Sequence, residues 1–232
     1  MRRRLPSPLV LILVSLVFQY SVVRGYASAE KEVQALKSQA FSVPEQRAAG
    51  RKDAPIAIEV FSDFQCQGCA EFYLQTLARV IEDYCDKGKV FLIHREYPLA
   101  IHRYAREAAR WALASANIGQ YERVAAALFR DQSVWGKSGD IEATVASVLT
   151  PRELASVKQA MKDDGDRIDA ALERDISLGH SFPVHGTPSF RILVHGIETF
   201  ADHDEPEKIL PTDPRLKSYP ILKRYLDEQL AK

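Results

Sequence analysis

Residues 61–69 have the sequence FSDFQCQGC, which places Cys66 and Cys69, with two residues between them, directly after an apolar run. The run at residues 56–61 predicts a buried strand. Two cysteines at this spacing have three interpretations: half of a metal site, a structural disulfide, or a redox-active pair. The residues on either side of the cysteines help to decide among these three interpretations.

The residues that follow the cysteines predict a strand–helix–strand unit. Apolar residues recur at helical spacing from Cys69 to Tyr84, which predicts a helix that ends before Gly88. A second apolar run at 90–93 predicts another buried strand, parallel to the first through a right-handed crossover. The cysteines therefore lie at the carboxyl end of the first strand, where sites of chemistry commonly lie.

The position of Cys66 at the start of this helix favours thiol chemistry. A thiolate is the nucleophile of disulfide exchange, and the helix dipole and free backbone N–H groups stabilise it there. Cys69, one turn later, is close enough to close a small disulfide with Cys66. A metal site would need a second pair of ligands, and the sequence offers none. Cys85 is the one further cysteine, and the six histidines form no pair at ligand spacing. We therefore expect no metal, and a structural disulfide stays as an alternative.

Composition and the N-terminus bear on partners and compartment. The chain of 232 residues has 31 basic and 31 acidic residues, so we expect no binding to nucleic acid. Residues 2–4 are arginines, an apolar run follows from 9 to 23, and Ala27-Ser28-Ala29 comes next. This pattern predicts a signal peptide at 1–29 that is cleaved after Ala29, with an uncleaved membrane anchor as the alternative. Export predicts an oxidising compartment.

The rest of the chain separates into a helical and a strand-bearing part. Residues 30–52 predict a short helix or linker, because Pro44 and Gly50 interrupt them. Residues 99–180 are strand-poor and predict helices, one of which starts with a capping box at Thr150-Pro151-Arg152-Glu153. The last part predicts strands at 190–194 and 197–200, a turn at 195–196 between them, and an amphipathic helix at 219–230.

Three motifs, taken in order, resemble the DsbA-like branch of the thioredoxin superfamily. They are KDAP at 52–55, FSDFQC at 61–66 and GTPSF at 186–190. Tyr97-Pro98-Leu99, His102, and Leu128-Phe129 with Trp135 also resemble that family's helical insertion. The resemblance implies an α/β chain with a thioredoxin fold in two parts, 53–98 and 181–232, and a helical insertion domain at 99–180 between them.

The same resemblance implies the site. Cys66 and Cys69 are expected to form a redox-active disulfide in which Cys66 exchanges with substrate. A cis peptide bond is expected between Thr187 and Pro188. It would leave the backbone of Thr187 free to pair with an extended substrate chain beside the Cys66 sulfur.

The implied function is that of an exported thiol:disulfide oxidoreductase that forms disulfides in unfolded or reduced exported proteins. A membrane protein linked to quinone, resembling DsbB or vitamin K epoxide reductase, would reoxidise the pair. We expect a periplasmic monomer without a cofactor. One alternative is a disulfide isomerase or reductase, whose relatives dimerise through an N-terminal domain that residues 30–52 are too few to form. The other is a peptide-binding, chaperone-like module with a structural disulfide.

Two positions depart from the family pattern. Gln67 and Gly68, which we expect to contact substrate, stand between the cysteines, where DsbA has a histidine in place of Gly68. A glycine cannot stabilise the Cys66 thiolate with charge or a hydrogen bond, so we expect a less extreme oxidant. Many relatives also have a buried acid at the position of Val60. Glu59 is offset by one residue, which predicts a strand glutamate with other partners, or a proton relay if a bulge restores the register.

Four further residues carry smaller predictions. Cys85 is expected to be a buried, unpaired thiol, and Trp111 a core residue. Trp135 is expected in a loop, either as a core anchor or as a substrate contact. His185 is expected to be solvated near the Pro188 loop, with a charge close to Cys66 as the alternative.

Overall fold

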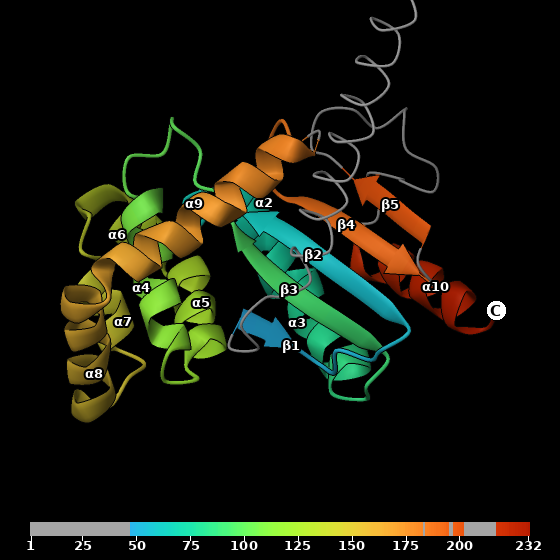
Figure 1. The fold of residues 1–232 in the computed structure, drawn as a ribbon, viewed down its shortest axis with the longest axis horizontal. Helices are drawn as coiled ribbons and strands as arrows, with labels where there is room; N and C mark the ends of the chain where they lie inside the picture. The colour runs from blue at the N-terminus through green and yellow to red at the C-terminus, as the bar shows by residue number, and fades with distance from the viewer. Residues whose placement is uncertain (1–46, 183, 195–196, 202–216) are drawn as a thin grey trace, which may run out of the picture. The chain divides into compact units, whose positions relative to one another are not determined.

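The computed structural model describes residues 47–182, 184–194, 197–201 and 217–232 (Figure 1). The predicted signal peptide at 1–29 and the predicted turn at 195–196 lie outside these residues. Of the helices described, none combines the length and apolar character needed to cross a bilayer.

A mixed sheet of five strands forms the centre of the fold, in the order β1-β3-β2-β4-β5 (Figure 1). The strands are β1 (Ala48–Ala49), β2 (Ile56–Ser62), β3 (Val90–Glu96), β4 (Ser189–Val194) and β5 (Ile197–Ala201). Strands β2 and β3 are parallel, as predicted, whereas β4 pairs antiparallel with both β2 and β5. The strand that leads to the cysteines is therefore the middle strand of the sheet.

Strand β1 lies within residues 30–52, for which the sequence predicts a short helix or linker. Ala48 and Ala49 pair antiparallel with Ile93 and Leu92 of β3. Alanine has little preference for strands, so the open edge of β3, and not the local sequence, accounts for this short pairing.

One helical segment begins directly after Cys66 and contains Cys69, as predicted. It consists of α2 (Gln67–Phe72), the π-helical turn η2 (Tyr73–Leu77), α3 (Ala78–Val80) and a second π-helical turn η3 (Ile81–Cys85). Its buried apolar side chains belong to the main apolar core, and the Phe72 ring stacks on Phe190 of β4 with 5.5 Å between ring centroids. Gly88 then adopts a φ of 68°, a left-handed conformation that glycine takes at least cost, and the chain turns into β3.

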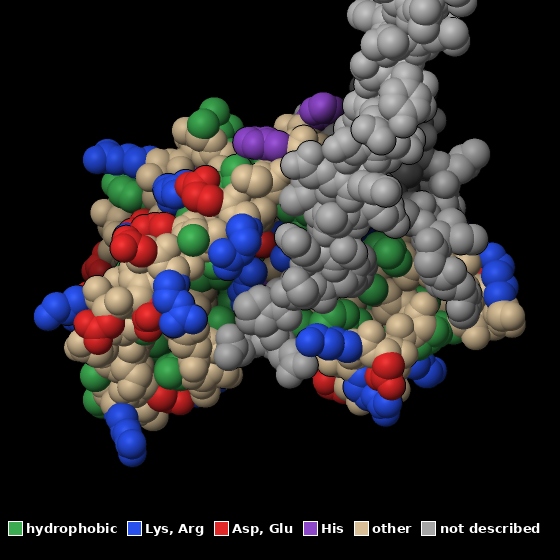
Figure 2. Space-filling model, in the orientation of Figure 1, with side chains coloured by type: hydrophobic (Ala, Val, Ile, Leu, Met, Phe, Trp, Pro, Cys, Tyr) green, Lys and Arg blue, Asp and Glu red, His purple; other side chains and the backbone are tan. Residues whose placement is uncertain are grey.

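Helices between β3 and β4 form a lobe beside the sheet (Figure 1). They are α4 (Ala105–Ala116), α5 (Tyr121–Arg130), α6 (Gln132–Ser138), α7 (Ile141–Ala146), α8 (Pro151–Asp163) and α9 (Gly165–Ser181). The predicted capping box is present at the start of α8, where Thr150 and Glu153 bond each other's backbone N–H groups. Figure 2 shows basic and acidic side chains interspersed over this lobe, in keeping with their equal numbers in the chain.

Trp135 corrects one prediction, because it lies in helix α6 and not in a loop. The helix ends at Gly139, whose φ is 79°. The Trp135 side chain is fully buried and its Nε1 donates to the Leu128 carbonyl at 2.7 Å. Of the two roles considered, core anchor is therefore the one that the structure supports. Trp111 is buried in helix α4, as predicted.

The two faces of the sheet are covered differently. Ile58 and Val60 of β2 belong to the main apolar core, which includes α2 and the predicted C-terminal helix α10 (Tyr219–Leu230). Phe61 points to the other face and packs with Tyr97 and Phe182. Helix α9 runs across this second face and packs on β3.

Buried charges lie on the second face. Glu59 of β2 pairs with Arg95 of β3, whose Nη2 is 2.5 Å from Oε1, and with Arg191 of β4. Asp175 of α9 lies 3.2 Å from Arg95 and also pairs with Arg47. We call Glu59, Arg95, Asp175 and Arg191 the sheet ion cluster. The main prediction for Glu59, a strand glutamate with other partners, is confirmed.

Candidate functional site

A tight turn joins β2 to helix α2 and presents Cys66. The backbone N of Cys66 donates to the Asp63 carbonyl at 3.1 Å, which closes the turn. Cys66 is the N-cap residue of α2, with φ −77° and ψ 120°, so its side chain lies beside the free N–H groups of the first helical turn. Its sulfur accepts a hydrogen bond from Cys69 N at 3.4 Å.

The two cysteines are free thiols in this structure and lie in opposite environments. Cys66 is partly exposed, whereas Cys69 is 1% exposed. The pKa of Cys66 falls to about 5, chiefly because the Cys69 side chain hydrogen-bonds its sulfur, while burial and the Asp63 charge act in the other direction. Burial, and then the contact with Cys66, raises the pKa of Cys69 well above its usual value. At neutral pH Cys66 is therefore a thiolate and Cys69 keeps its proton.

The loop at Pro188 lies directly against Cys66. The Thr187–Pro188 peptide bond is cis, as the resemblance implies. The Cys66 sulfur lies 3.2 Å from the Thr187 carbonyl oxygen, to which the thiol form donates. A Cβ on Gly68 would lie 3.5 Å from Pro188 Cδ and 3.8 Å from the Cys66 sulfur, and Gln67 is exposed next to it. The structure thus brings the predicted site residues together, although their separation in sequence exceeds 100 positions.

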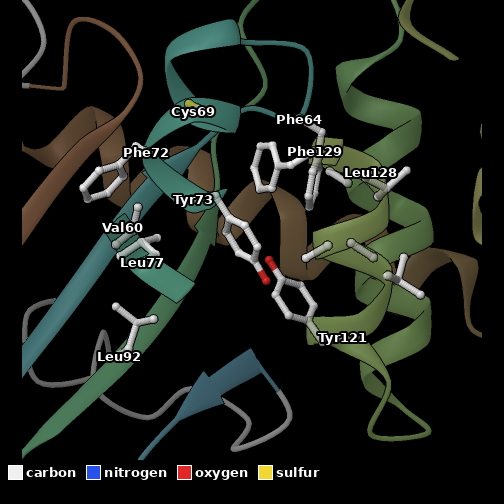
Figure 3. Close-up of a cluster of buried hydrophobic side chains, with 14 of the residues drawn as sticks. Val60, Phe64, Cys69, Phe72, Tyr73, Leu77, Leu92, Tyr121, Leu128 and Phe129 are labelled. Atoms are coloured by element: carbon white, nitrogen blue, oxygen red, sulfur yellow. The ribbon is translucent and has the colours of Figure 1, made fainter. Parts of the chain in front are cut away.

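The helical lobe holds the same turn from the other side. Gln132 of α6 donates to the Cys66 carbonyl at 3.0 Å. Gln65 donates to the Gly136 carbonyl at 3.3 Å. The rings of Phe64 and Phe129 pack with 4.7 Å between their centroids (Figure 3). The lobe therefore fixes the backbone that carries the reactive thiol.

Asp63, which the sequence analysis did not select, lies buried behind the turn. Its carboxylate accepts hydrogen bonds from the backbone N of Gln65 and of Leu99, each at 2.7 Å, and lies 2.7 Å from His102 Nδ1. Its own backbone N donates to the Cys69 sulfur at 3.5 Å. An acid that follows a buried strand and precedes a cysteine by three positions was the available signal, and both acid and histidine lie in the motifs quoted above.

The remaining predicted residues lie as follows. His185 is exposed on the loop before Thr187. Cys85 is an unpaired thiol, 2% exposed, and burial raises its pKa to about 12, so the prediction of a buried free thiol is confirmed. In the described part of the chain, no three His, Cys, Asp or Glu side chains are grouped as metal ligands would be. The absence of a metal stays a prediction.

The comparison with protein families identifies the chain. A family model described as "Thioredoxin" matches residues 42–211. The chain belongs to this thioredoxin family. Among curated relatives, "Probable disulfide bond formation protein D" of Bacillus cereus is 25% identical over 215 residues, covering 90% of this chain and 92% of the relative. "Disulfide bond formation protein D" of Bacillus subtilis is 23% identical over 171 residues, covering 71% and 75%.

Solved structures show the same fold. Wolbachia pipientis alpha-DsbA1 matches with a TM-score of 0.60 at 19% identity, covering 81% of this chain and 92% of that one. Oxidised BdbD of Bacillus subtilis matches with a TM-score of 0.56 at 20% identity, covering 81% and 94%. The predicted fold, a DsbA-like thioredoxin fold with helices inserted between strands, is confirmed.

Proposed function

We propose that Cys66 and Cys69 are the redox-active pair of a thiol:disulfide oxidoreductase that forms disulfide bonds in other proteins. The predicted activity is confirmed at the level of the enzyme class, because the Bacillus relatives are named as disulfide bond formation proteins. The observation that carries the residue assignment is the contrast between the two thiols. A partly exposed thiolate at a helix N-terminus covers a buried thiol that keeps its proton.

The first half of the reaction starts from the Cys66–Cys69 disulfide. A substrate thiolate attacks the Cys66 sulfur, a bond forms between these two sulfurs, and the bond to Cys69 breaks. Cys69 leaves with the electron pair and takes up a proton, as its high pKa requires. The product is a mixed disulfide between Cys66 and the substrate.

The second half releases the oxidised substrate. A second substrate thiolate attacks the substrate sulfur of the mixed disulfide, and Cys66 leaves as a thiolate. A thiol with a low pKa leaves faster, so the low pKa of Cys66 favours this step. Two electrons have then moved from the substrate to the pair, and the substrate holds a new disulfide.

A groove of about 660 Å³ beside the pair is the proposed place for the substrate chain. It runs from Gly68 and Pro188 along α2 to the start of α10. Its walls carry apolar and charged side chains, among them Glu71, Phe72, Arg79, Lys217 and Tyr219. Such a mixed surface suits an extended, unfolded polypeptide, whose backbone would pair with Thr187 next to the Cys66 sulfur.

The compartment and the electron acceptor belong to the same proposal. The N-terminal pattern at 1–29 supports export to the periplasm, where reduced or unfolded exported proteins would be the substrates. A membrane protein linked to quinone, DsbB-like or similar to vitamin K epoxide reductase, would accept two electrons from the reduced pair. A monomer is sufficient for this exchange, since both cysteines lie in one turn of one chain.

The test uses the oxidised protein with Cys85→Ala, which removes the third thiol, and reduced, unfolded ribonuclease A as substrate. We expect the enzyme to transfer about one disulfide per molecule to the substrate, measured as loss of free thiols. The matched controls, Cys66→Ser and Cys69→Ser, should transfer none. If the parent protein oxidises ribonuclease no faster than the controls, the pair is structural and a chaperone-like module becomes the better account.

A further inference from the structure

Asp63 connects the backbone around both sulfurs. Its N–H donates to the Cys69 sulfur at 3.5 Å, and its carbonyl accepts the N–H of Cys66 at 3.1 Å. One carboxylate oxygen accepts the Gln65 N–H within the same turn, at 2.7 Å. A side chain that is 1% exposed therefore lies directly behind the turn that carries the reactive thiol.

The other carboxylate oxygen of Asp63 is bound from the loop that follows β3. Leu99 N donates to it at 2.7 Å, and His102 Nδ1 lies at the same distance. A carboxylate can only accept, so the imidazole presents Nδ1–H to it. The Asp63 side chain is fully buried, whereas the His102 side chain is 24% exposed.

The charge of Asp63, directly after β2, is balanced less completely than that of Glu59 within β2. Glu59 pairs with two guanidinium groups, Arg95 and Arg191. Asp63 is held by backbone N–H groups and by His102. Its negative charge acts on the neighbouring Cys66, where it opposes ionisation of the thiol.

We propose that Asp63 and His102 set the reduction potential of the Cys66–Cys69 pair. The buried carboxylate destabilises the Cys66 thiolate of the reduced protein, and the imidazole limits this effect by bonding the carboxylate. Both are positioning residues, since neither exchanges a bond with the substrate. The inference rests on the proposed function, because it takes Cys66 as the exchanging sulfur.

The two residues have opposite effects in this account. Loss of the Asp63 charge stabilises the thiolate, favours the reduced pair and makes the protein a stronger oxidant. Loss of the His102 hydrogen bond leaves the carboxylate charge less compensated and makes the protein a weaker oxidant. A residue that only supports the fold would shift both variants in one direction.

The experiment compares Asp63→Asn, His102→Ala and the double variant with the parent, all with Cys85→Ala. The equilibrium constant against glutathione and the pKa of Cys66, from the ultraviolet absorbance of its thiolate, are measured at neutral pH and across a titration. For Asp63→Asn we expect a fall of about one unit in the pKa of Cys66 and a rise of about tenfold in the constant for reduction. His102→Ala should shift both in the opposite direction, and this shift should vanish in the double variant.

The control is Asp175→Asn, which removes a buried carboxylate from the second face of the sheet and should leave the Cys66 pKa where it is. If Asp63→Asn and His102→Ala shift the equilibrium in one direction, or leave it unchanged, the inference is wrong. His102→Ala alone decides the matter if Asp63→Asn does not fold. A parent protein that glutathione cannot reduce would instead overturn the proposed function.

Discussion

Two buried polar clusters, one on strand β2 and one around the turn that follows it, are built differently. The sheet ion cluster, at the middle of β2, pairs the two oxygens of Glu59 with Arg95 and Arg191, and α9 adds Asp175. Each of these four side chains is at most 6% exposed. Asp175 also pairs with the buried Arg47, so each of the two carboxylates meets two guanidinium groups, and water has little access.

The second cluster lies just beyond the carboxyl ends of β2 and β3. It comprises Asp63, Cys66, Cys69 and His102, and we call it the redox cluster. Here a thiolate and a carboxylate, both negative, lie around one turn. The compensation comes from backbone N–H groups, a helix N-terminus and a partly exposed imidazole. The sulfur of Cys66 is open to solvent in part, as a group that must react with a polypeptide requires.

The difference shows how position along one strand separates structure from chemistry. Charges in the middle of a sheet have neighbours on both sides and can be fully paired. Charges just beyond the carboxyl end of a strand have sheet residues on one side only, and on the other side they face the N-terminus of the next helix. We therefore expect substitutions in the sheet ion cluster to change stability, and substitutions in the redox cluster to change exchange chemistry.

The largest effect is expected for Cys69→Ser. Without the buried thiol, the Cys66 thiolate can still attack a disulfide of a scrambled, disulfide-bearing substrate, forming a mixed disulfide as the other substrate sulfur leaves as a thiolate. No Cys69 thiol is then present to resolve the mixed disulfide or to regenerate the internal disulfide. Catalytic turnover should fall to the uncatalysed rate, while covalent complexes between Cys66 and substrate accumulate. Non-reducing gels and mass spectrometry of the trapped species measure this. As a control, the double variant Cys66→Ser/Cys69→Ser should form no covalent complexes. Catalytic turnover by Cys69→Ser alone would contradict the assignment of Cys69 as the partner of Cys66.

Glu59→Gln is expected to have the next largest effect, on stability. It removes the Glu59 carboxylate from the buried Arg191 and leaves Arg95 with Asp175, and breaking a buried ion pair on one side costs about 3–5 kcal/mol. Urea denaturation measures the loss. The pKa of Cys66 should stay near the parent value.

A double-mutant cycle sharpens this prediction. Glu59→Gln combined with Arg191→Met should lower the free energy of unfolding by less than the sum of the two single substitutions, because the double variant removes both charges of this ion pair. Additive losses would mean that Glu59 and Arg191 do not interact.

The pH dependence of the reduced protein gives a smaller, graded effect. The pKa of Cys66 falls from an ordinary 9.0 to about 5 on folding, so folding favours the thiolate. This contribution is complete above the unfolded value and is lost as the pH falls through the folded value. The stability difference between the reduced parent and reduced Cys66→Ala should therefore grow as the pH rises from about 5 to 9. Unfolding at a series of pH values tests this, and a constant difference would contradict it.

The smallest effect is expected for Thr150→Ala, which removes the cap of α8 away from both clusters. We expect a loss of about 1 kcal/mol in the free energy of unfolding. The glutathione equilibrium and the Cys66 pKa should match those of the parent. A change in either would mean that the outer helices of the lobe act on the redox cluster.

The sequence predicts the two cysteines of the redox cluster because the strand and helix that carry them are local. The apolar run at 56–61, the helical stripe after Cys69 and the spacing of the cysteines specify strand, helix and thiols with few long-range contacts. The motif at Thr187 and Pro188 required the family resemblance, since nothing local connects it with Cys66.

The sheet ion cluster and Asp63 could not be predicted in the same way. Glu59 meets Arg191 because the two residues stand opposite each other in the antiparallel pairing of β2 with β4. It meets Arg95 because that residue lies two positions beyond its parallel partner, Ile93. Strand register is not readable from one sequence, so neither partner was available. Helix α6 was missed for a related reason: buried Trp135 stabilises it through tertiary packing, whereas its local sequence has weak helix preference.

The most direct test of the central claim is the equilibrium of the Cys85→Ala protein with glutathione redox buffers. The account predicts that Cys66 and Cys69 interconvert between dithiol and disulfide in one two-electron step. It also predicts a potential between roughly −270 mV, the value of thioredoxin, and roughly −120 mV, the value of DsbA. A disulfide that glutathione does not reduce at any ratio would show that the pair is structural and would contradict the account.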